Sequence, residues 1–270
     1  MTSHAFIALD AAQALAACGS VADRIAVQVV DSCASTNTEL LQSTTADNLY
    51  PVQVLAAEQQ TQGRGRRGKT WFSPPGDGLT FSLRWAMPHA PFLPDGLSLA
   101  VGVALARAVQ QYLPQPIQLK WPNDVLVEKQ KLAGILIELR PAGSRHTAAV
   151  IGIGLNVTMP SQAGAPVLSQ PVAALSQYVM PVPDRNILLG QILRQLLPLL
   201  DDFNQRGFAC CHAEWQQRNA FCGQPVQVTG EQSQLSGICT GVDHSGALQL
   251  HTQNGLCRIV SGDVSLRPMP

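Results

Sequence analysis

The sequence predicts an α+β protein in two parts, a larger part with a sheet and buried helices and a small C-terminal β-barrel. Residues 117–157 contain four strand-like runs separated only by turn residues. Strands at this spacing form antiparallel hairpins rather than β-α-β crossovers. After Gly223 the pattern changes to short strands separated by Gly, Asp and Asn, which is typical of a small barrel. A chain of 270 residues is long enough to bury a full core and carry such a module.

The N-terminal third is predicted to hold two helices and three strands. Residues 8–18 have the pattern of an amphipathic helix. Thr36 and Glu39 form a T-x-x-E capping box for a short helix that ends at Leu41. Apolar and β-branched residues predict strands at residues 25–30, 52–57 and 79–85.

The centre of the chain is predicted to contain one buried helix and the four hairpin strands. Residues 97–113 are apolar almost all round, and Pro114 ends this helix. The strands follow at residues 117–121, 125–127, 131–139 and 148–157. Residues 158–183 contain several prolines and are expected to form a loop. Two further helices are expected, at residues 186–203 with a kink or break at Pro198 and at residues 209–219.

The charge of the chain is balanced but locally concentrated. Lys and Arg number 18, as do Asp and Glu, and this balance argues against a general nucleic-acid binder. Four of the 18 basic residues fall between Arg64 and Lys69. Local positive charge on a neutral protein indicates a small anionic ligand.

Cysteine usage predicts a cytoplasmic protein. The seven cysteines are scattered and form no C-x-x-C, so neither a disulfide framework nor a zinc site is predicted. Cys210, Cys211 and His212 are adjacent and would project apart, so we interpret the two cysteines as partly buried thiols on a helix. Residues 1–18 lack the Lys or Arg of a secretory leader, and no apolar run approaches the roughly 20 residues of a membrane span.

Residues 61–78, TQGRGRRGKTWFSPPGDG, match two phosphate-binding patterns, the dinucleotide fingerprint G-x-G-x-x-G and the P-loop G-x-x-x-x-G-K-[ST]. Both patterns require a helix after the glycines, and two prolines and a glycine at residues 74–76 leave no room for one. We therefore reject both interpretations. The three glycines let the backbone approach a ligand, and Arg64, Arg66 and Arg67 can neutralise carboxylate and phosphate. The alternative is a solvated basic turn.

Two further segments carry polar residues at defined turns and strand faces. In KWPNDVLVEKQKLAGILIE, residues 120–138, Pro122 holds its neighbour extended and places Asn123 and Asp124 in a turn between two lysines. The alternative is that each lysine is simply exposed. In GIGLNV, residues 152–157, alternate glycines remove side chains from one strand face, as expected where a flat ligand lies against the backbone. Packing alone is the alternative explanation.

Together these segments resemble the biotin protein ligases. The family motifs G-R-G-R-x-G, K-W-P-N-D, K-x-A-G-[IV]-L-[IV]-E, G-[IV]-G-[IL]-N and S-T-N stand at residues 63–68, 120–124, 131–138, 152–156 and 35–37. The resemblance implies a class II aminoacyl-tRNA-synthetase-like mixed sheet flanked by helices, plus a C-terminal SH3-like barrel. It divides the chain into a helical extension (1–28), a catalytic biotin- and ATP-binding domain (29–220) and the barrel (221–270).

The resemblance also implies a two-step reaction and its partners. Biotin and ATP with Mg²⁺ give biotinyl-5′-AMP and pyrophosphate, and the acyl group then passes to a lysine of a biotin carboxyl carrier protein or domain, as in biotin–[acetyl-CoA carboxylase] ligases. No covalent nucleophile is expected. The 25–30 residues before the first strand are too few for the winged-helix domain of repressor-type members, so no nucleic-acid partner is expected. A strand edge in the hairpin region could pair two copies into a homodimer.

The family's site residues carry over by position. The resemblance implies Lys131 and Arg66 as catalytic residues and Asp124 as a Mg²⁺ ligand. The residues implied for biotin are Ser35, Thr36, Asn37, Gln60, Arg64, Gly65, Arg66 and Lys131. Those implied for ATP are Arg67, Trp71, Lys120, Asn123, Asp124 and Asn156. An adenine-capping segment is expected within residues 158–182.

Two rival functions remain open from the sequence. A lipoate or octanoate ligase or transferase of the same fold is the nearer one, although those enzymes lack the glycine-loop and K-W-P-N-D motifs together. A non-enzymatic nucleic-acid binder that uses residues 64–69 is the other, and sparse aromatic residues near the loop argue against it.

Overall fold

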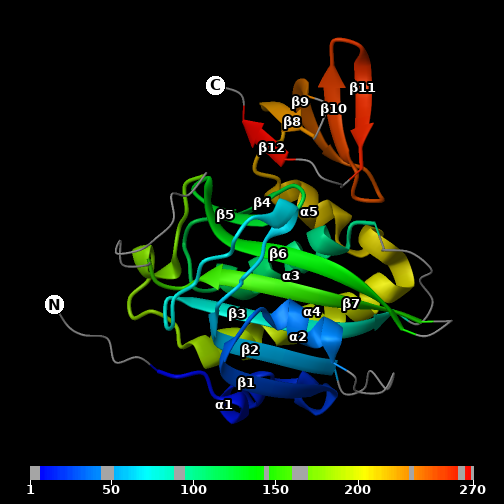
Figure 1. Cartoon of the computed structure of the whole chain (residues 1–270). Helices are drawn as coiled ribbons and strands as arrows, with labels where there is room; N and C mark the ends of the chain where they lie inside the picture. Colours follow the sequence, from blue (N-terminus) through cyan, green and yellow to red (C-terminus); the bar gives the residue numbers. More distant parts are fainter. Residues whose placement is uncertain are drawn as a thin grey trace.

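The computed structural model describes residues 7–43, 52–87, 95–142, 146–159, 170–230, 234–260 and 265–268. A mixed seven-stranded sheet forms the larger part, with the strand order β1-β2-β3-β7-β6-β5-β4 (Figure 1). The strands are β1 Ile25–Cys33, β2 Val52–Gln60, β3 Gly78–Met87, β4 Ile117–Lys120, β5 Asp124–Val127, β6 Gln130–Ala142 and β7 His146–Asn156. Strands β1 and β2 are parallel, and every other neighbouring pair is antiparallel. The predicted hairpin order of β4 to β7 is confirmed.

Helices cover both faces of this sheet. Alternate apolar residues of β3 face helices α3 Leu97–Gln110 and α4 Arg185–Arg206, and the Trp85 ring lies edge-on to Phe203 with centroids 6.4 Å apart. On the opposite face Ser82 hydrogen-bonds to Asn37 of helix α2 Thr36–Gln42. Helix α1 Ala11–Ala17 packs on α4, where a Cβ on Gly190 would lie 2.4 Å from the Cβ of Ala17. Within the described residues, no helix is long and apolar enough to cross a membrane.

Three sequence-based predictions about helices were wrong in detail. Of the predicted kink or break at Pro198, the break is wrong: helix α4 continues through Pro198, which lies on the exposed side while the leucines around it are buried and hold the helix in place. The helix predicted at residues 209–219 is a 3₁₀ turn, Gly207–Cys210, followed by α5 His212–Arg218.

The predicted capping box is absent, because Ser35 is the N-cap of α2 and makes no side-chain cap bond. The Thr36 hydroxyl instead contacts Ser82 and Gln60, so this residue serves the interior of the fold rather than the helix end.

The C-terminal part is a five-stranded antiparallel sheet, as expected for an SH3-like module. Its strand order is β11-β10-β9-β8-β12. The strands are β8 Pro225–Thr229, β9 Gln234–Val242, β10 Leu248–Thr252, β11 Gly255–Ile259 and β12 Ser265–Pro268. The short strands predicted after Gly223 are present, and the last strand, β12, was not singled out from the sequence. Val226, Leu248, Leu250 and Leu266 are buried in its core.

The two sheets are joined tightly at β4 (Figure 1). The Ala220 N–H donates to the Leu119 carbonyl over 2.9 Å, and Trp121 Nε1 donates to the Gly246 carbonyl over 3.1 Å. Gly246 has a φ of 86° and packs directly on the backbone of Gly96. Because residues 219 and 220 lie along β4, the edge of the hairpin region is covered at Leu119 and is not free there to pair with a second copy.

Candidate functional site

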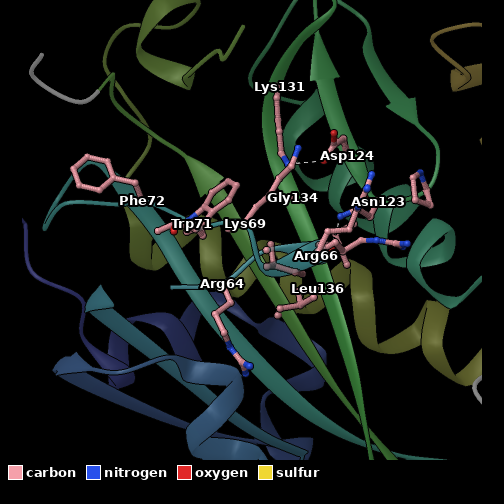
Figure 2. Close-up of a pocket in the computed structure, with 18 of the residues that line it drawn as sticks. Arg64, Arg66, Lys69, Trp71, Phe72, Asn123, Asp124, Lys131, Gly134 and Leu136 are labelled. Carbon is pink, nitrogen blue, oxygen red and sulfur yellow. Dashed lines mark hydrogen bonds and ion pairs between the residues drawn. The ribbon is translucent and has the colours of Figure 1, made fainter. Parts of the chain in front are cut away.

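One pocket brings together every residue that the sequence assigned to a ligand. Figure 2 labels six of them, Arg64, Arg66, Trp71, Asn123, Asp124 and Lys131. It lies between the start of α2, the glycine loop, the β4–β5 turn and the centres of β6 and β7. Its predicted members are Ser35, Thr36, Asn37, Gln60, Arg64, Gly65, Arg66, Arg67, Trp71, Lys120, Asn123, Asp124, Lys131 and Asn156. Segments distant in the sequence therefore converge on a single cavity.

The glycine loop folds as a small hairpin over this pocket. The Trp71 N–H donates to the Gly63 carbonyl over 2.9 Å, and the Gly65 N–H donates to Lys69 over 2.6 Å. A three-residue 3₁₀ turn, Arg66–Gly68, is the only helical segment from Gly63 to Gly78, all of which the structure describes. The rejection of the P-loop and dinucleotide interpretations is therefore supported. Gly63 is required here, because a Cβ would lie 2.4 Å from the Trp71 carbonyl oxygen.

Gly152 and Gly154 leave one face of β7 without side chains, but the reason is not the flat ligand that the sequence predicted. A Cβ on Gly154 would lie 2.3 Å from the Trp71 indole, and a Cβ on Gly152 would lie 2.3 Å from Asn37 Oδ1. The flat groups that lie against this backbone are thus two side chains of the protein itself. The Trp71 Nε1 atom is buried and has no hydrogen-bond acceptor among the described residues.

Three charged groups form the centre of the pocket. Lys131 Nζ lies 2.6 Å from Asp124 Oδ1, and Lys120 Nζ lies 3.6 Å from Asp124 Oδ2 (Figure 2). Lys131 also lies 5.5 Å from the centroid of the Trp71 ring. The pairing register of β5 and β6 shifts between Val125 and Leu126, and this bulge turns Lys131 toward the pocket. Burial lowers the pKa of Lys120, Asp124 partly restores it, and Lys131 lowers it further.

Asn123 and Asn156 donate hydrogen bonds to backbone carbonyls on either side of these charged groups. Asn123 Nδ2 donates to the Ile135 carbonyl over 2.8 Å. Asn156 Nδ2 donates to the carbonyls of Lys131, over 3.2 Å, and Ala173, over 2.9 Å. These donations tie both asparagines to the strand that carries Lys131 and to Ala173. Of the segment expected to cap adenine, residues 160–169 lie outside the described residues.

Several pocket residues were not found from the sequence. Arg267 of β12 reaches the pocket from the C-terminal sheet, and Leu136 of β6 forms an apolar wall. Arg267 adds a cation beside Lys120, whose pKa it also lowers. Glu138, which lies beside the pocket, ends the motif at residues 131–138, but the family resemblance implies no ligand contact for it. Only the placement of the C-terminal sheet beside the pocket brings Arg267 near Lys120, and no local pattern indicates that placement.

Comparison with known proteins gives the same assignment over both parts of the chain. Residues 29–156 match the biotin/lipoate A/B protein ligase family, and residues 221–267 match the biotin protein ligase C-terminal domain. The chain is 35% identical to the bifunctional ligase/repressor BirA of Escherichia coli over 211 residues, which cover 78% of this chain and 65% of that protein. It is 32% identical to a biotin–[acetyl-CoA-carboxylase] ligase of Mycobacterium tuberculosis over 244 residues, 88% of each chain.

Solved structures agree with this comparison. A biotin protein ligase from Aquifex aeolicus in complex with biotin and ATP superposes with a TM-score of 0.78 at 27% identity. The match covers 90% of this chain and 99% of that one. The fold neighbour thus spans both sheets.

Proposed function

This chain belongs to the biotin protein ligases, and we propose that it activates biotin with ATP and transfers it to a lysine of a carrier protein. It is a ligase that forms a carbon–nitrogen bond. The observation that carries the proposal is the convergence of the glycine-loop arginines, Lys120 and Lys131 on a pocket with apolar walls. Such a site can hold an apolar acid beside a polyphosphate.

The first step joins two anions. A carboxylate oxygen of biotin attacks the α-phosphorus of ATP, the new O–P bond forms, and pyrophosphate leaves. Positioned cations lower the barrier by stabilising charge that develops on the phosphate, without any covalent enzyme intermediate. Lys131 and Arg66 are assigned this role, because Lys131 is held by Asp124 at the centre of the pocket and Arg66 lies on the loop above it.

The second step releases AMP. The neutral amine of the carrier lysine attacks the acyl carbon of biotinyl-5′-AMP, the C–N bond forms, the C–O bond to phosphate breaks, and the amine loses its proton. The family acts on biotin carboxyl carrier domains, and relatives of this chain are named for acetyl-CoA carboxylase. A carrier domain of a carboxylase is therefore the proposed partner.

Ligand subsites follow the two sides of the pocket. Biotin is assigned to the α2 side, where Thr36 and Gln60 present polar atoms, and ATP to the side of Trp71, Asn123 and Asn156. The Trp71 ring and the two asparagines, which line the pocket beside Lys120 and Lys131, support a nucleotide there. The remaining assigned residues are Ser35, Asn37, Arg64, Gly65 and Lys131 for biotin and Arg67, Lys120 and Asp124 for ATP.

The donor set fits a Mg²⁺ ion that arrives with ATP. Mg²⁺ keeps several waters and binds through one or two carboxylates together with phosphates. Asp124 supplies one carboxylate in the pocket, and no cluster of three metal-binding side chains occurs in the part of the chain that the structure describes. Bound Mg²⁺ would neutralise phosphate charge opposite the lysines.

The three-part division of the chain is also proposed. The limits 1–28, 29–220 and 221–270 place α1 in the extension, the pocket helices and strands in the catalytic part and β8 to β12 in the barrel. Strand β1 starts at Ile25, so the first limit falls within that strand.

Biotin-dependent exchange between ATP and radioactive pyrophosphate tests the function. We expect exchange with biotin and none with lipoate or octanoate. Exchange that requires lipoate instead would establish the rival ligase of the same fold. Filter binding to DNA in the same buffer tests the nucleic-acid alternative, and retention of DNA without biotin-dependent exchange would support that alternative.

A further inference from the structure

Glu138 joins two walls of the pocket without lining it. Its carboxylate accepts a hydrogen bond from Asn37 Nδ2 at Oε2 over 2.8 Å. Arg64 Nη2, from the glycine loop, lies 3.2 Å from Oε1 and 3.3 Å from Oε2 and also donates to Thr38 Oγ1 over 2.9 Å. In Figure 2 the Arg64 side chain points away from Lys131 and toward α2. The roles proposed above leave Glu138 unused.

The carboxylate fixes the orientation of the Asn37 amide. An ionised carboxylate only accepts hydrogen bonds, so the NH₂ group of Asn37 must face Glu138 and its oxygen must face the other way. That oxygen accepts a hydrogen bond from Ser82 Oγ over 2.6 Å. Asn37 is 3% exposed, and the missing side chain of Gly152 provides the space that Oδ1 occupies. The amide cannot turn without losing all of these contacts.

The orientation of the Asn37 amide determines which atoms donate and which accept at Ser82 and Thr36. Ser82 uses its single proton on Asn37, so at its 2.6 Å contact with Thr36 Oγ1 it is the acceptor. The single proton of Thr36 then has two acceptors within reach, Ser82 Oγ at 2.6 Å and Gln60 Oε1 at 3.2 Å, and the shorter contact to Ser82 takes it. The Thr36 N–H donates to Gln60 Oε1 over 2.8 Å, which leaves the Gln60 NH₂ group free to donate. The pocket wall therefore offers one acceptor, from Thr36, and one donor, from Gln60.

We infer that Glu138 is a positioning residue that sets the donor–acceptor polarity of the biotin subsite and holds the glycine loop through Arg64. This inference rests on the proposed function. The cyclic urea of biotin has N–H donors and a carbonyl acceptor, which are complementary to Thr36 Oγ1 and Gln60 Nε2. Glu138 touches neither substrate, so its loss should weaken biotin binding and leave the ATP subsite largely unchanged.

Five variants test the inference by calorimetric biotin binding and by KM values in pyrophosphate exchange. For Glu138→Ala we expect the Kd and KM for biotin to rise roughly 10- to 100-fold, with the KM for ATP changed less than about twofold. The isosteric Glu138→Gln keeps an acceptor for Asn37 but not the charge for Arg64, so a smaller rise is expected. Glu214→Ala is the matched control, because Glu214 is likewise a half-buried carboxylate held by arginines, Arg107 and Arg218, but lies on α5 outside the pocket.

A charge exchange gives the sharpest readout. Asn37→Asp alone places two carboxylates together and should weaken biotin binding strongly. In the double variant Asn37→Asp/Glu138→Gln, the amide introduced at position 138 can donate to one oxygen of the carboxylate at position 37, and Ser82 still donates to the other. The donor–acceptor polarity is therefore restored, and biotin affinity should recover by roughly tenfold or more relative to Asn37→Asp. Equal rises in both KM values, unchanged biotin affinity, or no recovery in the double variant would overturn the inference. Wild-type protein that binds biotin without exchange would overturn the proposed function instead.

Discussion

At the scale of single residues, the pocket depends on contacts that constrain one another. Asp124 lies between two lysines and keeps their mutual repulsion from opening the β4–β5 turn. The sequence predicted the identity of these residues, because the turn at Pro122 and the hairpin spacing bring them together. It did not predict that Gly152 and Gly154 make room for Asn37 and Trp71, because contacts across a sheet depend on strand order and not on local pattern.

Lys131→Met should nearly abolish adenylation and leave the fold intact. Methionine keeps the apolar stem against Trp71, and Asp124 keeps Lys120 as a partner, so the melting temperature should change little. Loss of the positive charge should lower kcat for pyrophosphate exchange by roughly 10²- to 10³-fold. Exchange at the wild-type rate in this variant would remove Lys131 from the catalytic role.

At the scale of elements, the glycine loop is the one that the sequence described most fully. Its basic residues, its glycines and the absence of a following helix were all predicted, because each depends on residues close together in the chain. The ion pair between Arg64 of the loop and Glu138 was not predicted, because Glu138 lies on β6, far away in the sequence. The loop therefore has an anchored end at Arg64 and an exposed end at Lys69.

The two ends of the loop should respond differently to substitution. Arg66→Ala should lower exchange activity strongly, while Lys69→Ala should keep most of it, because Lys69 is exposed at the edge of the pocket. In a P-loop the lysine at this position would be indispensable. Measured kcat/KM values with the opposite ranking would revive the P-loop interpretation.

The loop should also close further when substrates supply negative charge. Its three glycines have high backbone entropy and its four cations repel one another, so the substrate-free loop should be accessible to protease. Limited trypsin digestion should cut the free protein near a quarter of its length, and biotin with MgATP should suppress that cut. Identical digestion rates with and without the ligands would rule out closure over the site.

At the scale of the whole molecule, the C-terminal sheet is part of the site and not an appendage. The contact of Gly246 with Gly96 and the Trp121 hydrogen bond hold this sheet against the larger part of the protein, and Arg267 of the same sheet lines the pocket. The sequence predicted a small β module after Gly223 but gave no indication of where it would lie. Such placement depends on the shapes of two folded surfaces, which short-range patterns do not encode.

Displacing this sheet by a change far from the pocket should therefore impair the nucleotide side. Gly246→Ala adds a methyl group that would lie 2.7 Å from the Gly96 Cα, so the two sheets must move apart. Gly255→Ala is the control, because it has a similar positive φ, 99°, but no neighbour within 4 Å of an added Cβ. Both variants should lose roughly 1–2 kcal/mol of stability from the unfavourable backbone conformation. Only Gly246→Ala should also raise the KM for ATP, by withdrawing Arg267, while biotin affinity stays near wild type. An unchanged KM for ATP in Gly246→Ala, or an equal rise in both variants, would show that the position of the C-terminal sheet does not govern the nucleotide subsite.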